Sequence, residues 1–135
     1  MKLYLLDTQT LGLFIQGIHP PLTQRMMQAT QAQTIATSAL CGAELRYGQS
    51  LLAPADPRRT AIDLLLHELP TLAWTAAAAD RYGDIQAQCS RQGQSLGELD
   101  ALIAAHALAE DLILVTPHAR RLARVEGLRV EDWVG

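Results

Sequence analysis

The order of apolar segments along the chain predicts an α/β fold in which helices flank a parallel sheet. Short apolar runs of strand length alternate with longer segments of helical periodicity, which is typical of such sheets. The length of 135 residues suits one domain, so we expect a single domain over residues 1–135. Hydrophobic residues make up 49% of the chain and aromatic residues only 4%, which favours a core of packed helices.

The N-terminal part of the chain is expected to hold two strands and two helices. Leu3–Leu6 is a short apolar run that predicts a buried strand. Residues 8–16 then predict a helix that ends at Gly17, and the Pro pair at 20 and 21 starts a second helix, 20–30. Residues 34–37 predict the next strand.

The middle of the chain predicts two more helices and a third strand. Ser38 can cap a helix that runs to residue 52, because a Ser side chain accepts a hydrogen bond from the first turn. A Pro-rich turn follows, and residues 58–69 then have apolar side chains at helical spacing. The sequence TLAW, residues 71–74, predicts a strand.

The C-terminal part predicts two helices, 75–91 and 95–111, followed by the strand LILVT at 112–116. A short basic segment, 117–124, leads to a last strand at 128–130. Taken together, these elements predict a central parallel sheet of four to five strands.

Composition also limits the location and class of the protein. Its formal net charge of -3 is not that of a protein that coats nucleic acid by charge alone. Cys41 and Cys89 stand apart from each other and from any zinc-binding spacing, so we expect reduced core residues in a cytoplasmic protein. The N-terminal apolar run is too short for a signal peptide, and no run approaches the roughly 18 residues of a membrane span, so no membrane association is expected.

Asp7 is the first candidate functional residue, because it directly follows the first predicted strand. Parallel sheets bind their ligands beyond the C-terminal ends of the strands, which is where this carboxylate is expected. The alternative is that Asp7 only caps the next helix, since Asp is a favoured N-cap residue.

Three further acids stand at informative helix positions. Glu44 lies among apolar residues inside its helix, where a carboxylate needs a partner. A salt bridge is the structural alternative, although Arg46, close in sequence, is expected to point elsewhere around the helix. Asp100 lies in the first turn of its helix, where the helix dipole by itself favours an acid. Glu98 is expected to form a capping box with Ser95 and is otherwise a candidate for an outer position around the site.

Five segments in order give the chain a resemblance to a known family. The segments LLDTQT, GAELRYG, SLGELDALIAAHAL, LILVT and VEGLRVEDW cover nearly the whole sequence. Together they resemble the PIN-domain family, and specifically the VapC-type toxins of toxin–antitoxin pairs. The resemblance implies a PIN-like three-layer α/β/α fold around the parallel sheet.

The same resemblance implies a function and a set of site residues. Matched to the family motifs, Asp7, Glu44 and Asp100 are expected to be catalytic and to bind Mg²⁺ or Mn²⁺, hard ions that prefer oxygen ligands. The implied activity is metal-dependent endonucleolytic hydrolysis of RNA phosphodiester bonds. The implied partners are RNA, a small VapB-like antitoxin and a second copy of the chain, with DNA bound only through the antitoxin.

The chain also departs from the family pattern. Gln9 stands where many members have Asn, and we expect it at an outer position of the site. After the strand LILVT, relatives usually read T-N-N or T-N-D, often with an acid a few residues on, whereas this chain has Thr116, Pro117 and His118. Thr116 is expected to orient a metal-bound water, although it can equally be a β-branched strand end.

Basic residues follow the altered corner. His118, Arg120, Arg121 and Arg124 are candidates for binding the RNA backbone, and a solvated helix face is the alternative for the three arginines. Because the fourth family acid is missing, a PIN-like scaffold that binds RNA or its antitoxin with weakened or lost nuclease activity is the main alternative function. A phosphatase of the haloacid-dehalogenase type would need a second Asp at the position of Gln9.

Overall fold

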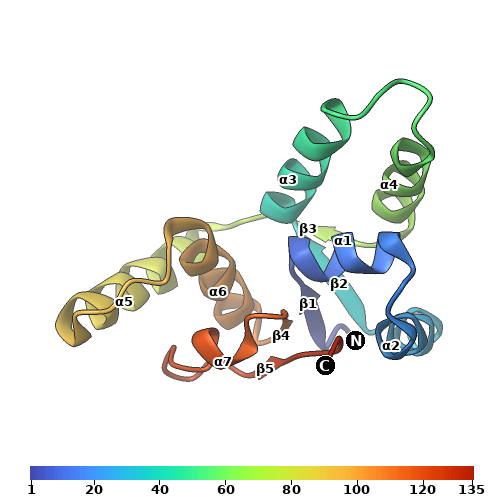
Figure 1. Ribbon diagram of the computed structural model, residues 1–135. Helices are drawn as coiled ribbons and strands as arrows, with labels where there is room; N and C mark the ends of the chain where they lie inside the picture. Colours follow the sequence, from blue (N-terminus) through green and yellow to red (C-terminus); the bar gives the residue numbers. More distant parts are fainter.

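The computed structural model describes residues 1–135 and contains a five-stranded parallel sheet in the order β3-β2-β1-β4-β5. The strands are β1 (Tyr4–Leu6), β2 (Ile35–Ser38), β3 (Thr71–Leu72), β4 (Ile113–Val115) and β5 (Val130–Glu131). The predicted α/β class and parallel sheet are therefore confirmed. Since β1 is the central strand, the residue that follows it lies at the middle of the C-terminal edge of the sheet (Figure 1).

Seven helices surround the sheet (Figure 1). They are α1 (Thr8–Gln16), α2 (Pro20–Gln31), α3 (Ala39–Ser50), α4 (Pro57–Glu68), α5 (Ala76–Gln92), α6 (Glu98–Glu110) and α7 (Ala119–Leu122). Helices α3 and α4 form one pair that extends away from the sheet, and α5 and α6 form a second pair on the other side of the molecule. No helix combines the length and apolar character that a membrane crossing requires.

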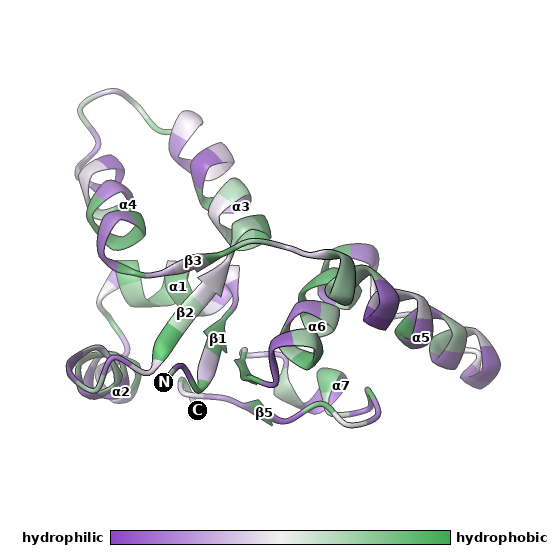
Figure 2. Cartoon of the chain, turned by 180° about the vertical axis from the view of Figure 1, so that it is seen from behind, coloured by the Kyte–Doolittle hydropathy of each residue, from purple (hydrophilic) through white to green (hydrophobic).

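The hydrophobic core lies on both faces of the sheet. Successive strand residues point to opposite faces, so Leu5 and Leu6 belong to different core layers. Leu5 packs with Leu114 of β4 in the layer under α5 and α6, whereas Leu6 packs with Val115 in the layer under α1, α2 and α4. Figure 2 shows hydrophobic residues in β1 and β2 and many hydrophilic residues along the outer helix α5. The expected three layers, helix on sheet on helix, are present.

Two of the predicted caps are confirmed. Helix α1 ends at Gly17, whose φ of 70° is the left-handed conformation that glycine adopts without strain. Helix α3 begins after Ser38, whose Oγ accepts a hydrogen bond of 3.1 Å from the backbone N–H of Leu40.

The predicted capping box of α6 is wrong. The N-cap of α6 is Gly97, with a φ of 84°, and Ser95 Oγ accepts a hydrogen bond from the N–H of Gly97 instead of capping the helix. Glu98 is then the first residue of the helix and Asp100 the third, so Asp100 does lie in the first turn, as predicted. The N-cap is therefore two residues later than the predicted Ser95, because the left-handed turn at Gly97 cannot be recognised from a Ser-x-x-Glu pattern.

Two other elements differ from their predicted ranges. The third strand is shorter than TLAW because Trp74 leaves the sheet and its Nε1–H donates to the backbone oxygen of Leu102 at 2.9 Å. The last strand was predicted to start at Leu128 but starts at Val130, because Leu128 packs in the core. The basic segment also contains a short helix, α7.

His106 of α6 is completely buried in the core. Its Nδ1 lies 2.8 Å from Oγ of Ser38, whereas its Nε2 has no hydrogen-bond partner. Burial lowers the pKa of His106, since a charged ring would lose its hydration there, and the negative charge of Glu110 opposes this shift only in part. Burial therefore disfavours protonation of this ring in the folded protein.

We expect the free energy of unfolding to fall between pH 7.5 and pH 5.5, through the ordinary His pKa of about 6.5. Because the folded-state pKa of His106 is lowered, the unfolded chain binds more protons in this range, so stability is lost as the pH falls. Thermal melting at the two pH values measures the effect. His106→Asn does not titrate and should show a smaller fall, and equal falls in both proteins would contradict the prediction.

Candidate functional site

The candidate site lies at the C-terminal edge of the sheet, around Asp7. Asp7 directly follows β1, and the register pairs Leu6 with Thr37 of β2 and with Val115 of β4. Residues that follow these paired positions lie next to one another, so Thr116 is the neighbour of Asp7 at the end of β4. The topology therefore gives Asp7 the central position predicted from its place in the sequence.

Asp7 also caps α1, as the structural alternative predicted. Its Oδ1 accepts a hydrogen bond of 2.8 Å from the N–H of Thr10, and the residue is only 6% exposed. Burial raises the pKa of Asp7, while hydrogen bonding from Thr116 and Thr10 acts in the opposite direction. The protein alone thus stabilises the charged form of this carboxylate incompletely, which is the electrostatic setting that favours a bound cation.

Glu44 is connected to Asp7 through the adjacent residue Thr8. It lies in α3, is half-buried, and its Oε1 accepts a hydrogen bond from the hydroxyl of Thr8. The alternative of a salt bridge is wrong, because Glu44 forms no ion pair, and Arg46, which was expected to point elsewhere, pairs with Asp63 of α4. The only hydrogen bond to Glu44 therefore comes from a residue of the Asp7 turn.

Asp100 is paired with a cation from the basic segment. Its Oδ2 forms an ion pair with Nη2 of Arg121 in α7, and the two side chains are 27% and 44% exposed. The dipole at the start of α6 and this ion pair both stabilise an acid at position 100. The structural alternative that was given for Asp100 therefore applies.

The three carboxylates surround the same strand ends without forming a closed cluster. Glu44 accepts a hydrogen bond from Thr8 beside Asp7, Thr116 is the neighbour of Asp7 at the end of β4, and Arg121, a few residues further along, pairs with Asp100. No three His, Cys, Asp or Glu side chains are arranged to hold a metal ion between them. The ion pair with Arg121 directs one Asp100 oxygen toward a guanidinium instead of toward the other acids.

The donor set nevertheless fits a hard divalent ion. Glu44 Oε2 and Asp100 Oδ1 accept no hydrogen bond, so each carboxylate keeps a free oxygen. Carboxylate oxygens are the ligands that Mg²⁺ and Mn²⁺ prefer, and Mg²⁺ usually needs only one or two of them beside its waters.

Thr116 and His118 form the turn after β4. Thr116 is completely buried, and its Oγ1 accepts a hydrogen bond of 3.0 Å from the N–H of His118. The Thr116 hydroxyl also lowers the pKa of Asp7, so Thr116 influences the candidate ligand as well as ending the strand. The positive charge that His118 can carry acts on Asp7 in the same direction.

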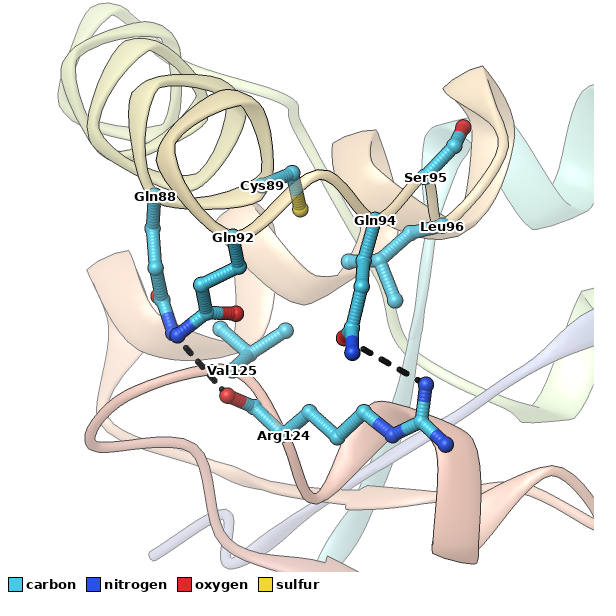
Figure 3. A pocket seen from close by; sticks show the side chains of 8 residues that line it. All are labelled: Gln88, Cys89, Gln92, Gln94, Ser95, Leu96, Arg124 and Val125. Atoms are coloured by element: carbon cyan, nitrogen blue, oxygen red, sulfur yellow. Dashed lines mark hydrogen bonds between the residues drawn. The ribbon is translucent and has the colours of Figure 1, made fainter.

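The three arginines of the basic segment have different surroundings. Arg121 pairs with Asp100, and Arg124 turns away, with its Nη1 3.4 Å from Oε1 of Gln94 and its backbone oxygen bonded to Gln88 (Figure 3). Arg120 is exposed and has no ion-pair or hydrogen-bond partner. Arg120 is therefore the free cation of the set, and a single basic strip is not formed.

The two outer candidates make no contact with the site. The side chains of Gln9 and Glu98 are exposed, and neither forms a hydrogen bond. Sequence reasoning missed Thr8 as the partner of Glu44 and gave Arg121 no role toward Asp100. Thr8 could have been suspected as the hydroxyl next to Asp7, whereas the Arg121 contact depends on how α7 packs.

Comparison with known proteins agrees with this architecture. The PIN domain family matches residues 4–128. The ribonuclease VapC2 of Haemophilus influenzae is 35% identical over 134 residues, which are 99% of this chain and 100% of that protein. The tRNA(fMet)-specific endonuclease VapC of Shigella flexneri is 32% identical over 133 residues, 98% of this chain and 99% of its own.

Solved structures of similar chains come from complexes. The DNA-bound VapBC structure from Salmonella typhimurium contains a chain that superposes with a TM-score of 0.90 at 28% identity and covers 98% of this chain and 99% of its own. VapBC2 from Rickettsia felis, bound to a fragment of promoter DNA, gives a TM-score of 0.88 at 28% identity, with 97% and 98% covered. The chain therefore belongs to the PIN-domain family and, within it, to the VapC-type ribonuclease toxins.

Proposed function

We propose that this protein is a divalent-metal-dependent endoribonuclease that hydrolyses RNA phosphodiester bonds, and that it is the toxin of a toxin–antitoxin pair. The observation that carries the proposal is the buried Asp7 at the centre of the strand ends, next to Thr8, whose hydroxyl donates to Glu44, and beside the Thr116 hydroxyl, which lowers the pKa of Asp7. Asp100 reaches the same edge beside α7. The names of the relatives, ribonuclease and endonuclease, support the same reading.

Asp7, Glu44 and Asp100 would hold Mg²⁺ or Mn²⁺. Such an ion, when bound, offsets negative charge on the phosphate and makes a coordinated water more acidic. Thr116, whose hydroxyl lowers the pKa of Asp7, would orient the Asp7 carboxylate and a nearby water. Arg120, which is free, supplies positive charge for the RNA backbone beside the site.

The partners are inferred from the relatives. The similar chains in the VapBC structures are complexed with antitoxins on DNA, so we infer a small VapB-like antitoxin for this chain and DNA contact through that antitoxin. We also infer a homodimer.

A second candidate function is an RNA-binding scaffold with weak nuclease activity. The ion pair between Arg121 and Asp100 favours it, because the guanidinium occupies a carboxylate oxygen that a metal would need. The free oxygens of Glu44 and Asp100 and the central place of Asp7 favour the nuclease.

Cleavage of defined RNAs by the antitoxin-free protein tests the proposal. We expect Mg²⁺ or Mn²⁺ to support cleavage of one RNA in a panel that includes tRNA(fMet), and EDTA to abolish it. Asp100→Asn should lower the rate at least about 100-fold, because even changes around metal ligands typically cost 10–100-fold. Asp80→Asn is the matched control, since Asp80 is exposed on α5 and has no ion pair.

The outcomes separate the two functions. Cleavage that survives both EDTA and Asp100→Asn would contradict the metal-dependent mechanism. RNA binding without cleavage, at metal concentrations that saturate the protein, would favour the scaffold.

A further inference from the structure

The ion pair between Arg121 and Asp100 joins a basic residue to a candidate metal ligand. The other ion pairs of the chain lie elsewhere, between Arg25 and Glu131, Arg46 and Asp63, Arg58 and Asp56, and Arg129 and Asp111. The Arg121 pair is therefore the one salt bridge that involves a residue of the carboxylate site. A metal ion and this guanidinium would seek the same carboxylate.

The fold fixes the backbone from which Arg121 reaches Asp100. Leu122, the next residue, is 2% exposed in the core, and its N–H donates to the backbone oxygen of His118 at 3.1 Å. Val125 is 3% exposed, and its N–H donates to the oxygen of Leu122. The backbone of α7 is thus held by core packing and backbone hydrogen bonds, whereas the Arg121 side chain is 44% exposed and lies outside the core.

The neighbouring arginines do not share this position. Arg120 has no partner, and the guanidinium of Arg124 is directed to Gln94 (Figure 3). At this corner the chain therefore presents a positive charge to Asp100.

We propose that Arg121 is a positioning residue that occupies Asp100 when no metal is bound and releases it when a divalent ion binds, so that it lowers the metal affinity of the site. The inference rests on the proposed metal site. Its physical basis is competition for Asp100. An ion that coordinates both carboxylate oxygens must displace the guanidinium from Oδ2, and an ion on the free Oδ1 alone is still repelled by the neighbouring positive charge. A weaker metal site is the expected consequence.

Titration of the antitoxin-free protein with Mn²⁺, followed by calorimetry or by the electron paramagnetic resonance of free Mn²⁺, tests the inference. We expect Arg121→Gln to lower the Kd for Mn²⁺ about two- to fivefold, the range that an exposed ion pair supplies. Arg120→Gln is the matched control, because it removes the same charge one residue away without touching Asp100, and its Kd should change less than 1.5-fold, a bound on the order of the weakest exposed pairs. Arg121→Lys, which keeps the charge, should lie nearer to the wild type.

Each result of the titration decides one question. An unchanged or higher Kd for Arg121→Gln, or an equal decrease for both Gln variants, overturns the role of Arg121. A wild type that binds no Mn²⁺ beside an Arg121→Gln variant that does would support it most strongly, whereas failure of both to bind overturns this inference and the proposed metal site together. Melting in EDTA shows that each variant is folded, and Arg121→Lys serves if the Gln variant is not.

Discussion

Asp7→Asn is expected to lower the rate of RNA cleavage at least about 100-fold while leaving the protein folded. Asn keeps the size of the side chain and is as good an N-cap as Asp, so its oxygen can still accept the hydrogen bond from Thr10. It removes the negative charge that a divalent ion needs at the centre of the strand ends. The variant therefore separates the capping role of Asp7 from its proposed metal-binding role.

Two further variants complete the comparison. Asp7→Ala loses the cap as well, and should reduce the free energy of unfolding by about 1 kcal/mol relative to Asp7→Asn. Asp56→Asn is the control, because Asp56 caps α4 by accepting from the N–H of Arg58 but lies far along the chain from the site. It should leave the cleavage rate unchanged.

Rates with a defined RNA and thermal melting curves of the same preparations provide the two measurements. If Asp7→Asn cleaved RNA at the wild-type rate, Asp7 would be only a helix cap and the metal site would have to be sought elsewhere. If it failed to fold, the buried side chain would need its charge for stability, which the raised pKa of Asp7 argues against.

The parts of the fold that depend on local pattern could be read from the sequence. The first helix was predicted with the bounds that the structure has, because Asp7 and Gly17 supply clear signals at its two ends. The sheet class followed from the alternation of short apolar runs with helices. The strand order was not predicted, since strands of two residues such as β3 and β5 are too short to specify a neighbour.

The site could be predicted only in part, for a physical reason. Family resemblance indicates which acids belong together, but the rotamer of Asp100 depends on Arg121, a residue 21 positions away whose helix is four residues long. The hydrogen bond between Thr8 and Glu44 likewise depends on how α3 packs beside the turn that contains Asp7. Pairwise contacts of this kind between exposed or half-buried side chains leave no periodic signal in a sequence.

Leu114→Ala is expected to reduce the free energy of unfolding by about 2–5 kcal/mol. Leu114 is completely buried in β4, beside Leu5 of the central strand, under the layer of α5 and α6. Truncation loses the burial of the side chain and leaves a cavity between the sheet and helices that are themselves tightly packed. Denaturant unfolding, with the midpoint and slope fitted together, measures the change.

Leu64→Ala makes the same substitution where burial is absent, because Leu64 lies on α4 and is 57% exposed. Its free energy of unfolding should change by less than about 0.5 kcal/mol, since Ala is also a good helix former. A comparable loss in both variants would mean that the α5–α6 layer is not the tight core that holds β4 against β1. Because Asp7 and Thr116 are placed by the register of those two strands, that result would also weaken the geometric case for the site.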